Sequence, residues 1–173
     1  MIDEIRKNDR IKAVVLRVNS PGGSVLASSK IRSALDLLAG EKPLVASYGN
    51  YAASGGYWIS NGCQKIFSNP ATLTGSIGVF SMIPEFSGTA KKVAHVNVVT
   101  VGSNRHSDMF SLMRPFSKEE TDYMQAYVES IYEEFVNLVA KGRDMTPEAV
   151  DEIAQGRVWT GADAVGIGLV DEI

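Results

Sequence analysis

Apolar runs alternate with amphipathic segments along the first half of the chain. IKAVVLRVN (11–19) and PLVASYG (43–49) are short β-branched runs of the kind that form buried strands. Between them, SSKIRSALDLLAG (28–40) carries apolar residues at helical spacing and ends at Gly40, a suitable helix C-terminus. The order strand, helix, strand is typical of an α/β fold.

Shorter elements and then long helices follow. The pattern indicates, in order, a helix opening at the Ser54 stretch, strands at 64–69 and 76–80, a helix at 85–94, a strand at 95–101 and a loop at 102–116. Ser117 and Glu120 form a capping box that opens a long helix to about Gly142. Two further helices begin near Thr146 and Thr160.

Strands that alternate with helices over this length predict one α/β domain, residues 1–173, with a largely parallel sheet flanked by helices. In such sheets the loops at the carboxyl ends of the strands gather functional groups. Two glycine-rich segments, 20–24 and 53–56, are expected at such ends. Along the long helix, Tyr127, Ile131 and Phe135 form an apolar stripe, and we expect it to pack internally.

Composition narrows the choice of function. A hydrophobic content of 45% and a charged content of 21% are ordinary for a soluble globular protein, and a net charge of −3 gives no electrostatic footprint for nucleic acid. No apolar run is long enough to span a membrane, so any anchor is expected outside this sequence. Cys63, the only cysteine, excludes an internal disulfide and is expected to be buried. No motif requires a cofactor or a metal.

The stretch NYAASGGYWIS (50–60) places Ser54 between two alanines and two glycines. If Ser54 opens a helix, nearby amides and the helix dipole stabilise negative charge there, and the amide of Gly55 can donate to an oxyanion. A second donor from the Ser20–Ser24 loop, which contains Gly22 and Gly23, would complete an oxyanion hole. Taken alone, the first segment could be a small-residue packing patch and the second an ordinary turn.

A serine nucleophile needs a base, because a hydroxyl is a weak nucleophile at neutral pH. His95 begins an expected strand and reads as structural, whereas His106 lies in the irregular loop with Asp108 two residues away. Such close neighbours rarely supply both the base and the group that orients it. A lysine with a lowered pKa is the other recognised base for serine.

Three motifs in order resemble the signal peptide peptidases of the bacterial protease IV type, serine–lysine peptidases of the Clp protease/crotonase superfamily. They are VVLRVNSPGGS (14–24), NYAASGGYWIS (50–60) and NPATLTGSIGV (69–79), and AQGRVWTGADAVGIGLVDEI (154–173) resembles the closing segment of that family. The resemblance covers essentially the whole chain. It implies the layered Clp/crotonase fold.

The resemblance also implies roles for four residues. Ser54 corresponds to the nucleophile, and the amides of Gly23 and Gly55 to the oxyanion hole. Ser76 matches a serine whose hydroxyl contacts the catalytic lysine, although without the resemblance it would be read as a turn serine.

The chain departs from the short members of the family at the lysine. Their lysine lies in the loop before the long helix, but this chain has no lysine between Lys92 and Lys118. Arg105 cannot replace it, because an arginine pKa is too high for a general base. Lys118 is best read as a solvated surface charge, and Lys91 and Lys92 as an exposed helix face.

Long members of the family consist of two similar halves, of which the amino-terminal half supplies the lysine and the carboxyl-terminal half the serine. This chain resembles the carboxyl-terminal half, and its abrupt ends are read as cuts through a longer protein. The resemblance further implies remnant signal peptides as substrates and a homo-oligomer at the periplasmic face of the bacterial inner membrane. The isolated chain is expected to be nearly inactive.

Three alternatives stay open at this stage. The chain could be a self-contained hydrolase with His106 as base, or a scaffold domain without chemistry of its own. It could also be an acyl-CoA enzyme of the crotonase type, which shares the fold and a two-amide oxyanion hole. The activated-serine context of Ser54 argues against the last.

Overall fold

A computed structural model describes residues 1–173 and divides them into two compact units. Unit 1 consists of residues 1–79 and 132–173, and unit 2 of residues 80–131. The long helix α5 (Lys118–Arg143) contributes its first half to unit 2 and its second half to unit 1. Each unit is described by itself.

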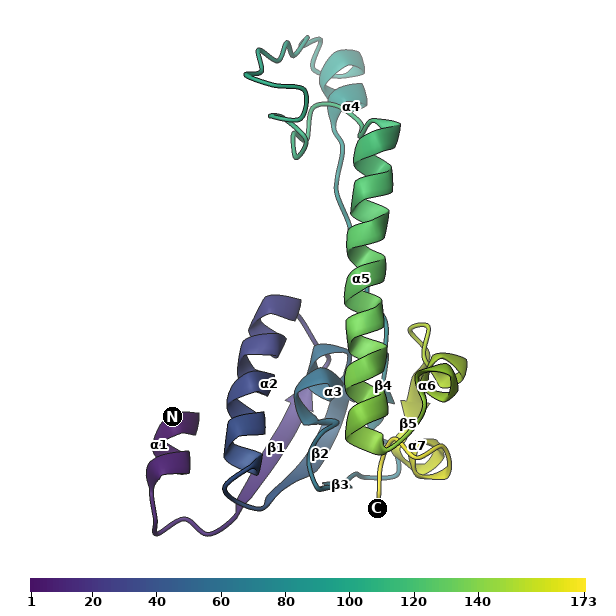
Figure 1. The fold of residues 1–173 in the computed structure, drawn as a ribbon. Coiled ribbons are helices and arrows are strands. Elements are labelled where there is room, and N and C mark those ends of the chain that lie inside the picture. The colour runs from purple at the N-terminus through teal and green to yellow at the C-terminus, as the bar shows by residue number, and fades with distance from the viewer. The chain divides into compact units, whose positions relative to one another are not determined.

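The sheet of unit 1 is largely parallel, as the sequence predicted (Figure 1). Its strands are β1 (Val14–Ser20), β2 (Leu44–Ala53), β3 (Lys65–Phe67), β4 (Leu73–Gly75) and β5 (Val158–Thr160). Strands β1, β2, β4 and β5 are neighbours in that order, and β3 pairs with the beginning of β2. Only the β4–β5 pair is antiparallel. Strand β2 therefore lies in the interior of the sheet, and its carboxyl end is enclosed by β1 and β4.

The helices of unit 1 are α1 (Ile2–Lys7), α2 (Val25–Ala39), α3 (Gly55–Ser60), α6 (Pro147–Ile153), α7 (Gly161–Gly166) and the second half of α5. They pack on the strands, as α3 and α7 do, or on one another, as α1 does on α2. Helices α2 and α3 lie side by side, and α3 also packs on β1 and β2. Trp58 of α3 stacks on Phe135 of α5, with ring centroids 4.7 Å apart. These contacts join both ends of the unit 1 sequence in one core.

Two expected strands are absent. The strand that pairs in the sheet is β4, just before the expected strand at 76–80. Ser76 has a φ of 47° and donates its N–H to Arg157 O, and this conformation turns the chain out of the sheet. The segment 95–101 makes no ladder, and Val101 is 95% exposed. An apolar run forms a strand only where a neighbour satisfies its backbone groups, and no such neighbour pairs with this segment.

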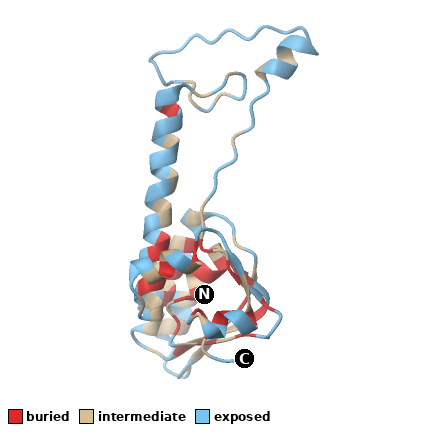
Figure 2. Ribbon diagram, turned by 90° about the vertical axis from the view of Figure 1, so that its right-hand side faces the viewer, coloured by how far each residue is buried: buried red, intermediate tan, exposed pale blue.

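Unit 2 contains α4 (Ser87–Lys92), a loop and the first half of α5. The predicted capping box is confirmed: Ser117 N donates to Glu120 Oε2 at 2.8 Å, and Glu120 N donates to Ser117 Oγ at 3.2 Å. Glu120 is the only buried residue of unit 2 (Figure 2). Internal packing was predicted correctly for Phe135, which is 1% exposed, but wrongly for Tyr127, which is 53% exposed.

Cys63 is buried, as predicted, and burial raises the pKa of its thiol to about 11. A thiol with this pKa is almost fully protonated at neutral pH and therefore a poor nucleophile. None of the helices combines the length and the apolar character needed to cross a bilayer.

Candidate active site

Ser54 lies at the turn between β2 and α3, the position expected from the sequence. Its φ of 51° and ψ of −120° are unusual for a residue with a side chain. Two hydrogen bonds hold this geometry: Ser54 N donates to Gly75 O at 2.9 Å, and Ser54 O accepts from Trp58 N at 2.8 Å. Strained backbone of this kind persists only where the surroundings enforce it, and it collects at functional sites. A sharp strand-to-helix turn of this type presents a serine hydroxyl to solvent in other serine hydrolases.

The glycine-rich loop after β1 packs directly against Ser54. A Cβ atom added at Gly22, whose φ is 113°, would lie 2.7 Å from Ser54 Cβ and 2.9 Å from Gly55 N. Any side chain at this position would therefore collide with the serine. The pairing of Ser20 with Ala52 at the ends of β1 and β2 brings the two segments together.

Gly23 and Gly55 meet at the same place. A Cβ atom added at Gly55 would lie 3.1 Å from Gly23 N. Gly55 is the first residue of α3, so its N–H has no acceptor within the helix, and no acceptor bonds the N–H of Gly23. Two free amides thus lie beside Ser54, which is the arrangement that an oxyanion hole requires.

Ser76 also lies at this edge of the sheet. Ala53 of β2 pairs with Gly75 of β4, so Ser54 and Ser76 each follow a residue of the same pair. Ser76 takes a positive φ and is held by its bond to Arg157 O. The four predicted site residues are therefore gathered from three strand ends.

No lysine of the chain is buried, and the two that are half-buried are already engaged. Lys42 Nζ donates to Asn8 O at 2.6 Å and to Ile5 O at 3.0 Å, and Lys65 pairs with Glu172. The hydrogen bond that Lys65 donates to Glu172 raises the pKa of Lys65, which is the wrong direction for a base. Ser54 Oγ itself makes no hydrogen bond to its neighbours.

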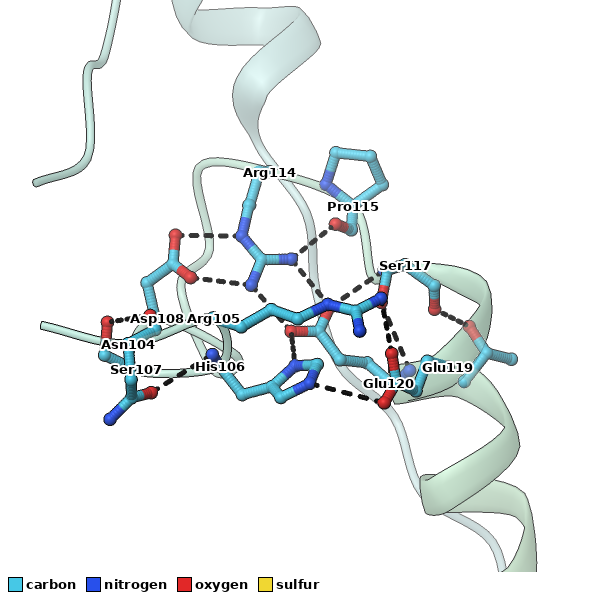
Figure 3. Close-up of polar contacts among 11 residues, drawn as sticks. Asn104, Arg105, His106, Ser107, Asp108, Arg114, Pro115, Ser117, Glu119 and Glu120 are labelled. Carbon is cyan, nitrogen blue, oxygen red and sulfur yellow. Dashed lines mark hydrogen bonds and ion pairs between the residues drawn. The ribbon is translucent and has the colours of Figure 1, made fainter. Parts of the chain in front are cut away.

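His106 belongs to a polar cluster within unit 2, which also contains Asp108, Arg114, Ser117 and Glu120 (Figure 3). Its Nδ1 lies 3.1 Å from Glu120 Oε1. Asp108 instead accepts two hydrogen bonds from Arg114, at 2.7 and 2.8 Å, so it does not orient the imidazole. The pairing of His106 with Asp108 that a triad would need is therefore absent.

Arg114 is the centre of this polar cluster. It also donates to both oxygens of Glu120 at 2.8 Å, and these bonds hold the pKa of Glu120 well below its usual range. The bond from Arg114 lowers the pKa of Asp108 in the same way. The cluster fastens the loop 102–116 to the beginning of α5.

Two residues of α2 that sequence reasoning missed also reach the site region. Arg32 is buried and donates to Trp58 O at 3.0 Å and to Asn61 Oδ1 at 2.7 Å, which ties α2 to the end of α3. Ser28, one turn earlier, is buried against Gly55. The sequence could have indicated both residues, because a serine and an arginine lie four residues apart on an otherwise apolar helix face. Nowhere do three potential metal-ligating side chains gather to hold an ion.

Comparison with known proteins identifies relatives of the chain. The model of peptidase family S49 matches residues 36–173. Protease 4 of Salmonella typhi is 46% identical over 173 residues, covering 99% of this chain and 28% of that protein. A putative signal peptide peptidase SppA of Enterococcus faecium is 42% identical over 173 residues, and the match covers 99% of this chain and 50% of that protein. The chain thus spans at most about half of these two relatives.

A solved structure of a ClpP1 mutant from Listeria monocytogenes superposes with a TM-score of 0.62, covering 99% of this chain and 82% of that chain. At 16% sequence identity this likeness shows the fold alone. The Clp-like layered fold expected from the sequence is therefore confirmed.

Proposed function

The chain belongs to peptidase family S49, and we propose that it is the serine-bearing domain of an endopeptidase with Ser54 as nucleophile. The observation that carries the proposal is the strained turn at Ser54, against which the free amides of Gly23 and Gly55 are packed. Acyl transfer needs a nucleophile beside an oxyanion hole, and this arrangement supplies both.

In the proposed reaction, Ser54 Oγ attacks the carbonyl carbon of a peptide bond and transfers its proton to a base. The carbonyl electrons move to the oxygen, which the amides of Gly23 and Gly55 stabilise as an oxyanion. The C–N bond then breaks, the amine leaves with the proton from the base, and an acyl-enzyme remains. Water, deprotonated by the same base, attacks the ester and releases the acid and Ser54.

We propose that this base is a lysine from another domain, the amino-terminal half of a longer protein. The support is that every lysine here is exposed or engaged, whereas a neutral lysine base needs burial to lower its pKa. The part of each relative that this chain does not cover leaves room for such a domain. Ser76 is proposed to hold the incoming amine.

The substrate and the setting are proposals of the same kind. Remnant signal peptides are the proposed substrates, in keeping with the name of the Enterococcus relative. A homo-oligomer at the periplasmic face of the inner membrane is the proposed assembly. Unit 2 exposes several large apolar side chains, and exposed apolar surface often marks a site of contact with another protein. These side chains support an assembly and include Phe80, Met82, Val99 and Val101.

Turnover of a signal-peptide substrate by the longer protein tests this proposal. Ser54→Ala should abolish turnover, and Ser76→Ala should reduce it through the lysine. Ser33→Ala, an exposed serine of α2, is the matched control and should have no effect. Undiminished turnover by Ser54→Ala would refute the proposal.

A further inference from the structure

Ser28 is a buried residue whose hydroxyl forms no hydrogen bond and is not sealed from solvent. It lies in the second turn of α2, is 7% exposed, and its Oγ makes no hydrogen bond in the structure. Serines in helices usually bond to the carbonyl four residues earlier, as Ser33 Oγ does to Ser29 O at 2.9 Å. Trp58 Nε1 is the only fully buried side-chain nitrogen or oxygen without a partner, so the Ser28 oxygen remains accessible to an incoming group.

The Ser28 side chain points at Gly55. A Cβ atom added at Gly55 would lie 2.7 Å from Ser28 Oγ and 3.1 Å from Gly23 N. In an α-helix the Cα–Cβ bond and the N–H bond both lean toward the helix N-terminus. Ser28 Oγ and Gly23 N therefore both lie beside the position of a Gly55 Cβ, next to the residue whose amide is free.

The setting of Ser28 is rigid. One turn further along α2, Arg32 donates to Trp58 O and Asn61 Oδ1, which fixes α2 against α3. Because Ser28 and Arg32 lie four residues apart, the same contact presses Ser28 against the beginning of α3. A donor held in this way needs no reorganisation when charge develops beside it.

We propose that the Ser28 hydroxyl is a third donor to the oxyanion, beside the amides of Gly23 and Gly55. The proposal rests on the proposed function of Ser54 and adds a side-chain donor to it. The hydroxyl proton points to the substrate oxygen in the tetrahedral intermediate and stays on Ser28 throughout. Ser28 is thus a catalytic residue that transfers no proton.

The test uses the longer protein that carries this chain and the variants Ser28→Ala and Ser28→Cys. Both should lower kcat for a peptide substrate by roughly 10- to 100-fold, a limited loss because two amide donors persist. KM should be nearly unchanged, because the oxyanion forms only after the substrate is bound. A peptide aldehyde, which forms a tetrahedral adduct with Ser54, should bind more weakly by the same factor. Binding of the cleaved product peptide, which has no oxyanion, should not change.

Controls separate this effect from loss of structure. Ser28→Cys leaves no cavity and replaces the hydroxyl by a thiol, a weak donor, so it stays informative if Ser28→Ala unfolds. Ser33→Ala is the matched change on the exposed face of α2. Unchanged kcat and aldehyde affinity in both Ser28 variants, with Ser54→Ala inactive, would overturn the third donor alone. Full activity of Ser54→Ala would overturn the proposed function itself.

Discussion

Unit 1 and unit 2 are held together by different means. Unit 1 has an apolar core that includes Leu38, Ile66, Phe135 and Leu169, all at most 3% exposed. In unit 2 the only buried residue is a carboxylate, Glu120, fastened by Arg114 and by the backbone of Ser117. Large apolar side chains of unit 2 are exposed instead.

The difference shows which unit can position a reacting group. A packed interior transmits strain and keeps side chains in one arrangement, so unit 1 can maintain the unfavourable backbone of Ser54. Unit 2 lacks such an interior, and its exposed apolar residues are suited to contact with another surface. We therefore assign chemistry to unit 1 and contact to unit 2.

Substitutions in the two halves of α5, one in each unit, should differ most in their effect on stability. Phe135→Ala removes a ring packed on Trp58 and should lower the free energy of unfolding by about 3–5 kcal/mol. Tyr127→Ala, two turns earlier on α5 and half exposed, should change it by less than about 0.5 kcal/mol. Denaturant unfolding of both variants measures this, and equal losses would mean that the two halves of α5 contribute equally to stability.

Glycine substitutions should also act differently in the two units. Gly55→Ala brings a methyl group against Ser28 Oγ and Gly23 N and should lower the turnover of the longer protein by roughly 10²- to 10³-fold, the loss expected for an oxyanion donor. Gly88→Ala, in α4, meets nothing within 4 Å and should leave turnover unchanged. Steady-state kinetics distinguishes the two, and an active Gly55→Ala would contradict the packing described here.

A local effect is expected in unit 2. Arg114→Met removes the guanidinium from Glu120 and Asp108, so the loop 102–116 should lose its attachment. Hydrogen exchange should become faster in this loop, while unit 1 keeps its protection. Arg105→Met is the matched control, because Arg105 pairs only with Glu119 and is three-quarters exposed. Equal exchange in both variants would mean that the cluster does not hold the loop.

The smallest effect is a dependence on pH. The pKa of Glu120 lies below its ordinary value of 4.5, so the ionised form contributes stability that is complete above pH 4.5 and is lost as the pH falls further toward the lowered pKa. Acid should therefore loosen the loop 102–116. Hydrogen exchange corrected for its intrinsic pH dependence measures this. Glu120→Gln should reduce the pH dependence to the part that Asp108 contributes, and a loop insensitive to acid in the unsubstituted chain would contradict the assignment.

The sequence predicted much of unit 1 because its signals are local. Apolar runs located β1 and β2, helical spacing located α2, and the capping box located the beginning of α5. The strands expected at 76–80 and 95–101 were wrong, because an apolar run does not reveal whether a pairing partner exists. The prediction that Tyr127 packs internally was wrong for a similar reason, since helical spacing predicts an apolar face but not what covers it.

The candidate site was predictable in part. Small residues around Ser54 and the paired glycines Gly22 and Gly23 indicated close backbone contact, and the structure brings them together. The backbone angles of Ser54 depend on bonds to distant residues such as Gly75, so they could not be read from its neighbours. Ser28 was missed because its importance comes from a contact with Gly55, across two elements.

The most direct test is labelling with a fluorophosphonate probe, applied in parallel to this 173-residue chain and to the longer protein that we propose carries it. We expect Ser54 to be labelled in the longer protein and not in the isolated chain, because we propose that the lysine base lies outside these residues. Equal labelling of both would contradict it. The base would then lie within this chain.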